Sequence, residues 1–201
     1  MSALRRLVLL RHGNTVGNSH ERFHGSSDVA LSDEGREQVR AAGRALATEV
    51  FELVAASPLR RSWESAAMLA GGAPVRLVPE FREIHFGRWE GLTTEEIEER
   101  DPVLHRAWRE KAPDFEFPGG EPRAAFRERV VAGLTRVEAG GAKNALLVIH
   151  KGVIRVLAEH LLGEPLAAPP ELGQAVSLTR DGEKWFLGRR SSNPPALREV
   201  A

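Results

Sequence analysis

The sequence predicts an α/β protein in which a mostly parallel central sheet lies between two layers of helices. Two apolar runs, over residues 7–10 and 145–149, are continuous rather than alternating, as in strands that are covered on both faces. Stretches with apolar residues at helical spacing separate the predicted strands. Because strands that alternate with helices favour parallel pairing, the pattern indicates a three-layer α/β/α arrangement.

The predicted elements follow in order after the first strand. Ser32 is expected to cap a helix, with two acidic residues in its first turn. A strand over 51–56 precedes a helix over 58–70, for which Ser57 is the expected cap, and a short strand over 75–78 comes next. The N-terminal half therefore supplies three strands of the sheet.

The C-terminal half completes the sheet after an insertion. From about residue 80 to 121 the periodicity is poor and short helical stretches are expected, which indicates a small helical cap over one sheet edge. A long amphipathic helix, the strand over 145–149, a helix over 153–162 and a hairpin over 175–189 follow. We expect residues 1–201 to form one domain.

The composition excludes several classes of function. Lys plus Arg and Asp plus Glu both total 28, so no global attraction to nucleic acid or to an anionic membrane is expected. The absence of cysteine excludes disulfides, thiolate nucleophiles and cysteine-based zinc sites. No stretch reaches the roughly 18 apolar residues of a spanning helix, and the first apolar run is too short for a signal sequence. We expect a cytoplasmic protein with a small-molecule partner. Exposed strand edges could pair with those of a second copy, so a homodimer is a further possibility.

Basic residues and histidines follow three of the predicted strands. Arg11 and His12 come directly after the first strand, Arg60 and Arg61 shortly after the second, and His150 directly after the fourth. The carboxyl ends of parallel strands open on one crevice, so these side chains are expected to meet there. Imidazole can act as a nucleophile and guanidinium matches phosphate oxygens, which together predict a phosphate site.

Three of the cations stand where a helix disfavours them. Arg60, Arg61 and Lys151 are expected in first turns, close to the positive end of the helix dipole. A bound anion would resolve this conflict, since helix N–H groups and a guanidinium can hold one phosphate together. The alternative is that these long side chains turn into solvent.

A metal site is the rival explanation for two histidines in one crevice. His20 and His24 have the spacing His-x-x-x-His, but they flank a Gly-Ser loop and lack the glutamate of the helical zinc motif. Catalytic zinc normally has three protein ligands, and the surrounding arginines would repel a dication. We therefore expect no metal.

Six motifs occur in order between residue 7 and about residue 155: Leu10-Arg11-His12-Gly13, Arg22-Phe23-x-Gly25-x-x-Asp28-x-x-Leu31-Ser32-x-x-Gly35, Ser57-Pro58-Leu59-x-Arg61, Glu83-Ile84-x-Phe86-Gly87-x-Trp89-Glu90-Gly91, Pro118-Gly119-Gly120-Glu121 and Val148-Ile149-His150. Together they resemble the histidine phosphatases, also called the phosphoglycerate mutase-like superfamily. The resemblance implies that family's fold and a phosphohistidine mechanism that needs no cofactor.

The resemblance also implies a role for each site residue. His12 would attack phosphorus with one ring nitrogen while a backbone acceptor holds the other. Arg11, Arg61 and His150 would surround the equatorial oxygens of the phosphoryl group. Glu83 would protonate the leaving oxygen and then take a proton from the attacking water.

Four further positions qualify the resemblance. The family places its phosphate-binding arginine four residues after the serine, which selects Arg61, with Arg60 as second choice. Asn18 resembles the asparagine that helps to hold the phosphoryl group. Asn14 stands where the family usually has glutamate. Lys151 stands where the family generally has glycine or alanine, and it would add a charge at the site mouth that favours more anionic substrates.

Hydrolysis of phosphomonoesters, with broad specificity, is the expected reaction, because the segment between Glu83 and His150 is short for the mutase branch. A mutase must keep water from its phosphorylated intermediate. Phosphoglycerate mutase and α-ribazole phosphatase remain alternatives, and a non-catalytic phosphate-binding module is a further one. Aromatic residues of the cap would form either an apolar wall for the leaving group or the core of the cap: Trp89, Trp108, Phe115 and Phe117.

Overall fold

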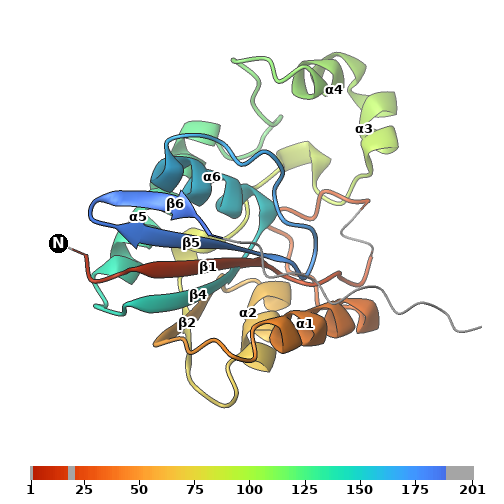
Figure 1. Ribbon diagram of the computed structural model, residues 1–201. Helices are drawn as coiled ribbons and strands as arrows, with labels where there is room; N and C mark the ends of the chain where they lie inside the picture. Colours follow the sequence, from red (N-terminus) through yellow and green to blue (C-terminus); the bar gives the residue numbers. More distant parts are fainter. Residues whose placement is uncertain (1, 18–20, 189–201) are drawn as a thin grey trace, which may run out of the picture.

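The computed structural model describes residues 2–17 and 21–188, and in this part of the chain one six-stranded sheet forms (Figure 1). The strand order is β3-β2-β4-β1-β5-β6. The strands are β1 (Arg6–Arg11), β2 (Leu53–Ala56), β3 (Val75–Leu77), β4 (Asn144–Ile149), β5 (Ala175–Asp181) and β6 (Lys184–Leu187). Strands β1 to β4 run parallel, while β5 is antiparallel to β1 and β6 to β5. The prediction of a mostly parallel sheet is confirmed.

Helices cover both faces of the sheet, as the continuous apolar runs predicted (Figure 1). The four helices are α1 (Asp33–Ala45), α2 (Arg60–Leu69), α5 (Arg123–Glu138) and α6 (Lys151–Leu162). Val8 and Leu10 of β1 belong to a buried cluster with Ala42 of α1, whereas Leu7 and Leu9 belong to another with residues of α5 and α6. Successive side chains of a strand point to opposite faces, so both faces of β1 are buried. The three-layer arrangement is therefore confirmed.

The segment between β3 and α5 is the one that the sequence predicts to form a cap. It contains two short 3₁₀ helices, η1 (Pro79–Phe81) and η2 (Gly87–Trp89), and the helices α3 (Thr94–Arg100) and α4 (Pro102–Arg109). Helices α3 and α4 stand away from the sheet (Figure 1). Trp89, Ile97 and Phe115 form a small buried core there, against which Trp108 and Phe117 pack. For Trp89, which is fully buried, the interpretation as cap core is the right one.

Two predicted helix starts are wrong by two residues. Helix α2 begins at Arg60 after Leu59, not at residue 58, and its N-cap makes no side-chain hydrogen bond. Ser57 still extends the sheet through its N–H to Val148 O (3.3 Å), and its hydroxyl accepts the N–H of Leu59. The chain turns into the helix only after this sheet contact. Helix α6 begins at Lys151 rather than at residue 153.

None of the helices in the described ranges is both long enough and apolar enough to cross a membrane. The predicted end of the hairpin, beyond residue 188, lies outside the described residues.

Candidate active site

The site begins at the carboxyl ends of two neighbouring parallel strands. Arg11 ends β1 and pairs in register with Ile149, which ends β4, so His12 and His150 follow at the same level of the sheet. The His12 N–H donates to Ile149 O (3.1 Å). The two imidazole rings lie edge to face, with centroids 5.1 Å apart. The expected meeting of these strand ends is what the structure contains.

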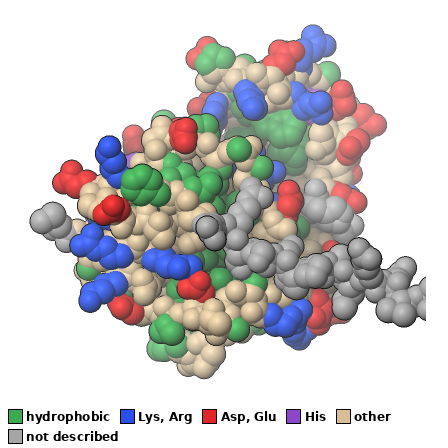
Figure 2. All heavy atoms as spheres, viewed as in Figure 1, with side chains coloured by type: hydrophobic (Ala, Val, Ile, Leu, Met, Phe, Trp, Pro, Cys, Tyr) green, Lys and Arg blue, Asp and Glu red, His purple; other side chains and the backbone are tan. Residues whose placement is uncertain are grey.

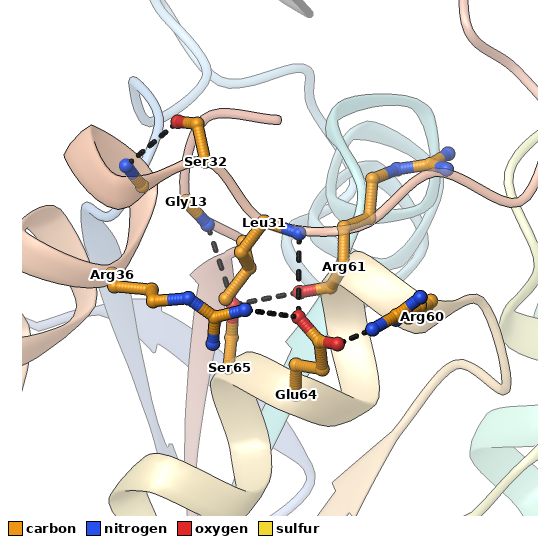
Figure 3. Close-up of polar contacts among 9 residues, drawn as sticks. Gly13, Leu31, Ser32, Arg36, Arg60, Arg61, Glu64 and Ser65 are labelled. Atoms are coloured by element: carbon orange, nitrogen blue, oxygen red, sulfur yellow. Dashed lines mark hydrogen bonds and ion pairs between the residues drawn. The ribbon is translucent and has the colours of Figure 1, made fainter. Parts of the chain in front are cut away.

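The turn after β1 depends on a close approach between two backbones. A Cβ atom on Gly13 would collide with the backbone of Gly35, near the start of α1, so no larger residue fits without movement. The Gly13 N–H also faces the Ser65 hydroxyl (3.4 Å), which itself donates to Arg61 O (2.7 Å; Figure 3). These contacts fix the turn that carries His12 against α1 and α2.

His12 is a neutral imidazole with a defined tautomer. Its Nδ1 lies 2.7 Å from Gly13 O and must donate to it, which leaves Nε2 with its lone pair, and Nε2 accepts the Nε–H of Arg61 (3.2 Å). Burial, followed by the charge of Arg61, lowers the pKa of His12 well below its ordinary value. Nε2 is therefore available as a nucleophile.

Of the two adjacent arginines of α2, Arg61 turns into the site. Its side chain is 2 % exposed, and it donates to Ser27 O (2.7 Å) and Gly25 O (2.5 Å) as well as to His12. Burial lowers the pKa of Arg61 to about 10, so it stays charged near neutral pH. Arg60 instead binds Glu64 (2.6 Å) and leaves α2 in another direction, with its side chain 54 % exposed (Figure 3).

Buried nitrogen atoms without partners lie next to His12 in the part of the chain that the structure describes. His150 is fully buried, and within residues 2–17 and 21–188 neither of its ring nitrogens has a hydrogen-bond partner. The same holds for Nε of Arg11. Burial, then the charge of Arg61, lowers the pKa of His150 well below its ordinary value. An unpaired buried polar group costs about 1–3 kcal/mol, and the oxygens of an anion would provide the missing acceptors.

Glu83 reaches the site from the cap segment. Its carboxylate is buried and accepts the N–H of Gly152 (2.9 Å), in the first turn of α6, and that of Ile84 (3.0 Å). Gly152 leaves room for this contact, because a Cβ atom there would collide with the carboxylate. Glu83 is thus anchored beside the helix that follows His150.

A cavity of about 940 Å³ connects these groups to the cap. Arg11, His12, Arg61 and Glu83 line it on the side of the sheet. Trp108, Phe115 and Phe117 line it on the side of α3 and α4, so these three aromatic residues both form part of the cavity wall and pack in the core around Trp89. Figure 2 shows the surface hollowed below α3 and α4, with hydrophobic side chains gathered in the hollow.

Two positioning residues had no role in the sequence analysis. Glu90 accepts from Ser26 N (2.9 Å), Ser27 Oγ (2.5 Å) and Phe86 N (3.0 Å), so it holds the loop whose carbonyl groups bind Arg61. The motif Trp89-Glu90-Gly91 contained the signal, but nothing in it linked Glu90 to that loop.

The second positioning residue is Arg129 of α5, which holds the backbone of Glu83. It donates to Glu83 O (3.2 Å) and Arg82 O (2.7 Å), and both oxygens of Glu121 bind its guanidinium. Only the folded chain brings α5 to this segment, so sequence spacing carried no signal for Arg129.

The remaining predicted residues are placed as follows. Lys151 lines the cavity at the start of α6, whereas Asn14 is buried and binds Glu34 (2.8 Å) away from the cavity. Asn18 lies outside the described residues, as does His20. His24 donates to Gly17 O (3.1 Å), and the described residues contain no group of three or more His, Cys, Asp or Glu side chains that could hold a metal.

Several proteins of known sequence or structure are similar to this chain. The chain is 40 % identical over 197 residues to glucosyl-3-phosphoglycerate phosphatase of Mycobacterium tuberculosis, covering 92 % of this chain and 88 % of that protein. It is 38 % identical over 180 residues to the enzyme of the same name from Mycolicibacterium vanbaalenii, covering 85 % and 80 %. The crystal structure of the α-ribazole phosphatase from Shigella flexneri superposes with a TM-score of 0.83 at 27 % identity, over 96 % of this chain and all of that one. The family model of the histidine phosphatase superfamily, branch 1, matches residues 7–189, and this chain therefore belongs to that superfamily.

Proposed function

We propose that the protein hydrolyses phosphomonoesters of small metabolites through a phosphohistidine formed at His12. The observation that carries this proposal is the tautomer of His12: Nδ1 is bound to Gly13 O and Nε2 keeps its lone pair beside Arg61. Within the described residues, Nε of Arg11 and both ring nitrogens of His150, whose ring lies edge to face with that of His12, have no hydrogen-bond partner. Such an arrangement stabilises the charge of a phosphoryl group during transfer to a nitrogen nucleophile.

The proposed reaction has two steps. In the first, Nε2 of His12 attacks phosphorus, the bond from phosphorus to the leaving oxygen breaks, and protonated Glu83 gives its proton to that oxygen. In the second, Glu83 takes a proton from water, the oxygen of that water attacks phosphorus, and the bond to His12 breaks to release inorganic phosphate. Arg11, Arg61 and His150 stabilise the phosphoryl oxygens in both steps.

The names of three of the relatives favour hydrolysis over phosphoglycerate mutation. The two mycobacterial relatives are named as phosphatases of glucosyl-3-phosphoglycerate, and the structural neighbour as a phosphatase of α-ribazole. We propose broad specificity for small phosphate esters, with the apolar cap side of the cavity receiving the leaving group. We further propose a single domain with residues 80–121 as its cap, action in the cytoplasm, and, where edge strand β3 or β6 pairs with its copy, a homodimer.

The test is the release of inorganic phosphate from a panel of esters by the wild type and by His12→Ala. We expect turnover and an acid-labile phosphoenzyme in the wild type and neither in the variant. His160→Ala, at an exposed position near the end of α6, is the control for removal of an imidazole. Interconversion of phosphoglycerates with little release of phosphate would identify a mutase instead. Phosphate binding without turnover in the wild type, retained by His12→Ala, would identify a non-catalytic module.

A further inference from the structure

Two cations of α6 line the cavity next to the proposed phosphoryl site. Lys151 and Arg155 are four residues apart in the helix, so they lie on the same side of it, one turn from each other. Both belong to the cavity wall, together with Arg11, His12 and Glu83. The substrate beyond its transferred phosphoryl group would therefore meet these two side chains.

Lys151 and Arg155 differ from two arginines of the same wall, Arg22 and Arg127. Arg22 is bound to Glu96 (3.0 Å) and Arg127 to Glu159 (3.2 Å), whereas the side chains of Lys151 and Arg155 make no hydrogen bond or ion pair with any residue that the structure describes. Glu159 stands one turn after Arg155 on α6, but its carboxylate is taken by Arg127 from α5. The two cations are thus left with free donors at the cavity.

Positive charge outweighs negative charge around Lys151. Burial, followed by the charges of Arg11 and Arg155, lowers the pKa of Lys151, although Glu171 and Glu83 act in the opposite direction. Lys151 also stands in the first turn of α6, close to the positive end of the helix dipole. The chain as a whole has no net charge, so this excess is local to the cavity.

We propose that Lys151 and Arg155 form a second anion site, which binds a carboxylate or a further phosphate carried by the leaving group of the substrate. The proposal rests on the proposed function, because it assigns the transferred phosphoryl group to Arg11, His12 and Arg61. An ester with two anionic groups then places one of them against Arg11 and Arg61 and the other against Lys151 and Arg155. This selects doubly anionic esters over matched neutral ones by electrostatic complementarity at the two ends of one ligand.

The test uses substrates that differ only in the second anionic group. 3-Phosphoglycerate and glycerol 3-phosphate share a skeleton, with a carboxylate in the first and a hydroxymethyl group in the second. 1,3-Propanediol bisphosphate and 3-hydroxypropyl phosphate form the corresponding pair for a second phosphate. The ratio of kcat/KM within each pair, measured by phosphate release, reports the preference of the enzyme, and comparison of the pairs shows which anion the site takes.

We expect the wild type to prefer the doubly anionic member of at least one pair, and Lys151→Ala and Arg155→Ala each to lower that ratio about tenfold. Arg155→Glu should lower it further. Lys184→Ala, which removes an exposed cation of β6 outside the cavity wall, is the control for net charge and should leave the ratio unchanged.

The outcomes separate this inference from the proposed function. No turnover of any ester by the wild type would refute the proposed function itself. Turnover without preference for either doubly anionic ester would overturn the second anion site. Variants that lower kcat/KM equally for both members of a pair would also overturn it, since that pattern describes a general loss of phosphoryl binding.

Discussion

Replacing Arg61 and its neighbour Arg60 in turn by alanine tests how the site selects one of two adjacent arginines. Arg61→Ala removes a buried guanidinium that donates to His12, and with it the charge nearest to the proposed nucleophile. Loss of a single preorganised donor costs about 10²–10³ in rate, and loss of an arginine that stabilises a transferring phosphoryl group about 10³–10⁵. We therefore expect kcat/KM to fall about 10³- to 10⁴-fold, or roughly 4–5.5 kcal/mol in transition-state binding.

Arg60→Ala is the matched control on the same helix. It removes an ion pair with Glu64, which lies four residues further along the helix, and about half of the arginine side chain is exposed to solvent. Such a contact is worth about 0.3–0.5 kcal/mol. Glu64 keeps the N–H of Leu31 (3.3 Å) and the guanidinium of Arg36 (3.4 Å). The free energy of unfolding should fall by less than about 1 kcal/mol, and kcat/KM should change less than about twofold.

The assay is phosphate release at substrate concentrations well below KM, with denaturant unfolding as the measure of folding. Arg61→Lys should recover only part of the rate, because an ammonium restores the charge but not the fork that binds two carbonyl groups and a phosphate oxygen together. Equal losses of kcat/KM in Arg60→Ala and Arg61→Ala would refute the assignment. So would an Arg61→Ala protein that folds and keeps more than about a tenth of the wild-type kcat/KM.

Three other predictions follow from the same contacts. Gly152→Ala should lower kcat about 10²-fold, because the added Cβ displaces the Glu83 carboxylate. Gly43→Ala on α1 is the control and should leave kcat unchanged. A normal kcat in Gly152→Ala would contradict the anchoring of Glu83. Glu90→Gln should lower kcat/KM at least about tenfold, because an amide cannot accept from all the N–H and O–H groups that this carboxylate holds; unchanged kinetics would show that the loop does not depend on it. The folded state holds the pKa values of His12 and His150 below about 6.5, the value expected in an unfolded chain, so the unfolded state takes up protons first on acidification. The free energy of unfolding should therefore fall from pH 6.5 downwards, with up to about 1.4 kcal/mol per pH unit from each histidine. His12→Ala should remove its share of this slope and leave that of His150, and stability that rises on acidification would contradict the reasoning.

The parts of the site that the sequence predicted are those that follow directly from local structure. A continuous apolar strand ends where His12 begins, and another ends where His150 begins, so parallel pairing of β1 with β4 was enough to bring the two histidines together. The choice of Arg61 over Arg60 came from the resemblance to a family, because two adjacent arginines at one helix start look alike to helix propensity and dipole arguments.

The parts that escaped prediction depend on contacts between distant segments. Arg129 binds the backbone of Glu83 across more than forty positions of sequence, and Glu90 binds Ser26 and Ser27 across more than sixty. The start of α2 was missed because Ser57 still makes a sheet contact with Val148, which no local capping preference describes. In each case the partner of a backbone group was set by the fold.

The two halves of the cavity depend on different parts of the fold, and this bears on how the preferred substrate can change. The proposed phosphoryl site rests on strand ends and on Arg61, which make contacts with the sheet, α1 and α2. The second half of the cavity is lined by the cap and by the exposed side of α6, where Lys151 and Arg155 hold no other residue in place. Substitutions there alter the charge that meets the leaving group without moving His12, so the ester that is preferred can change while the chemistry at phosphorus stays the same.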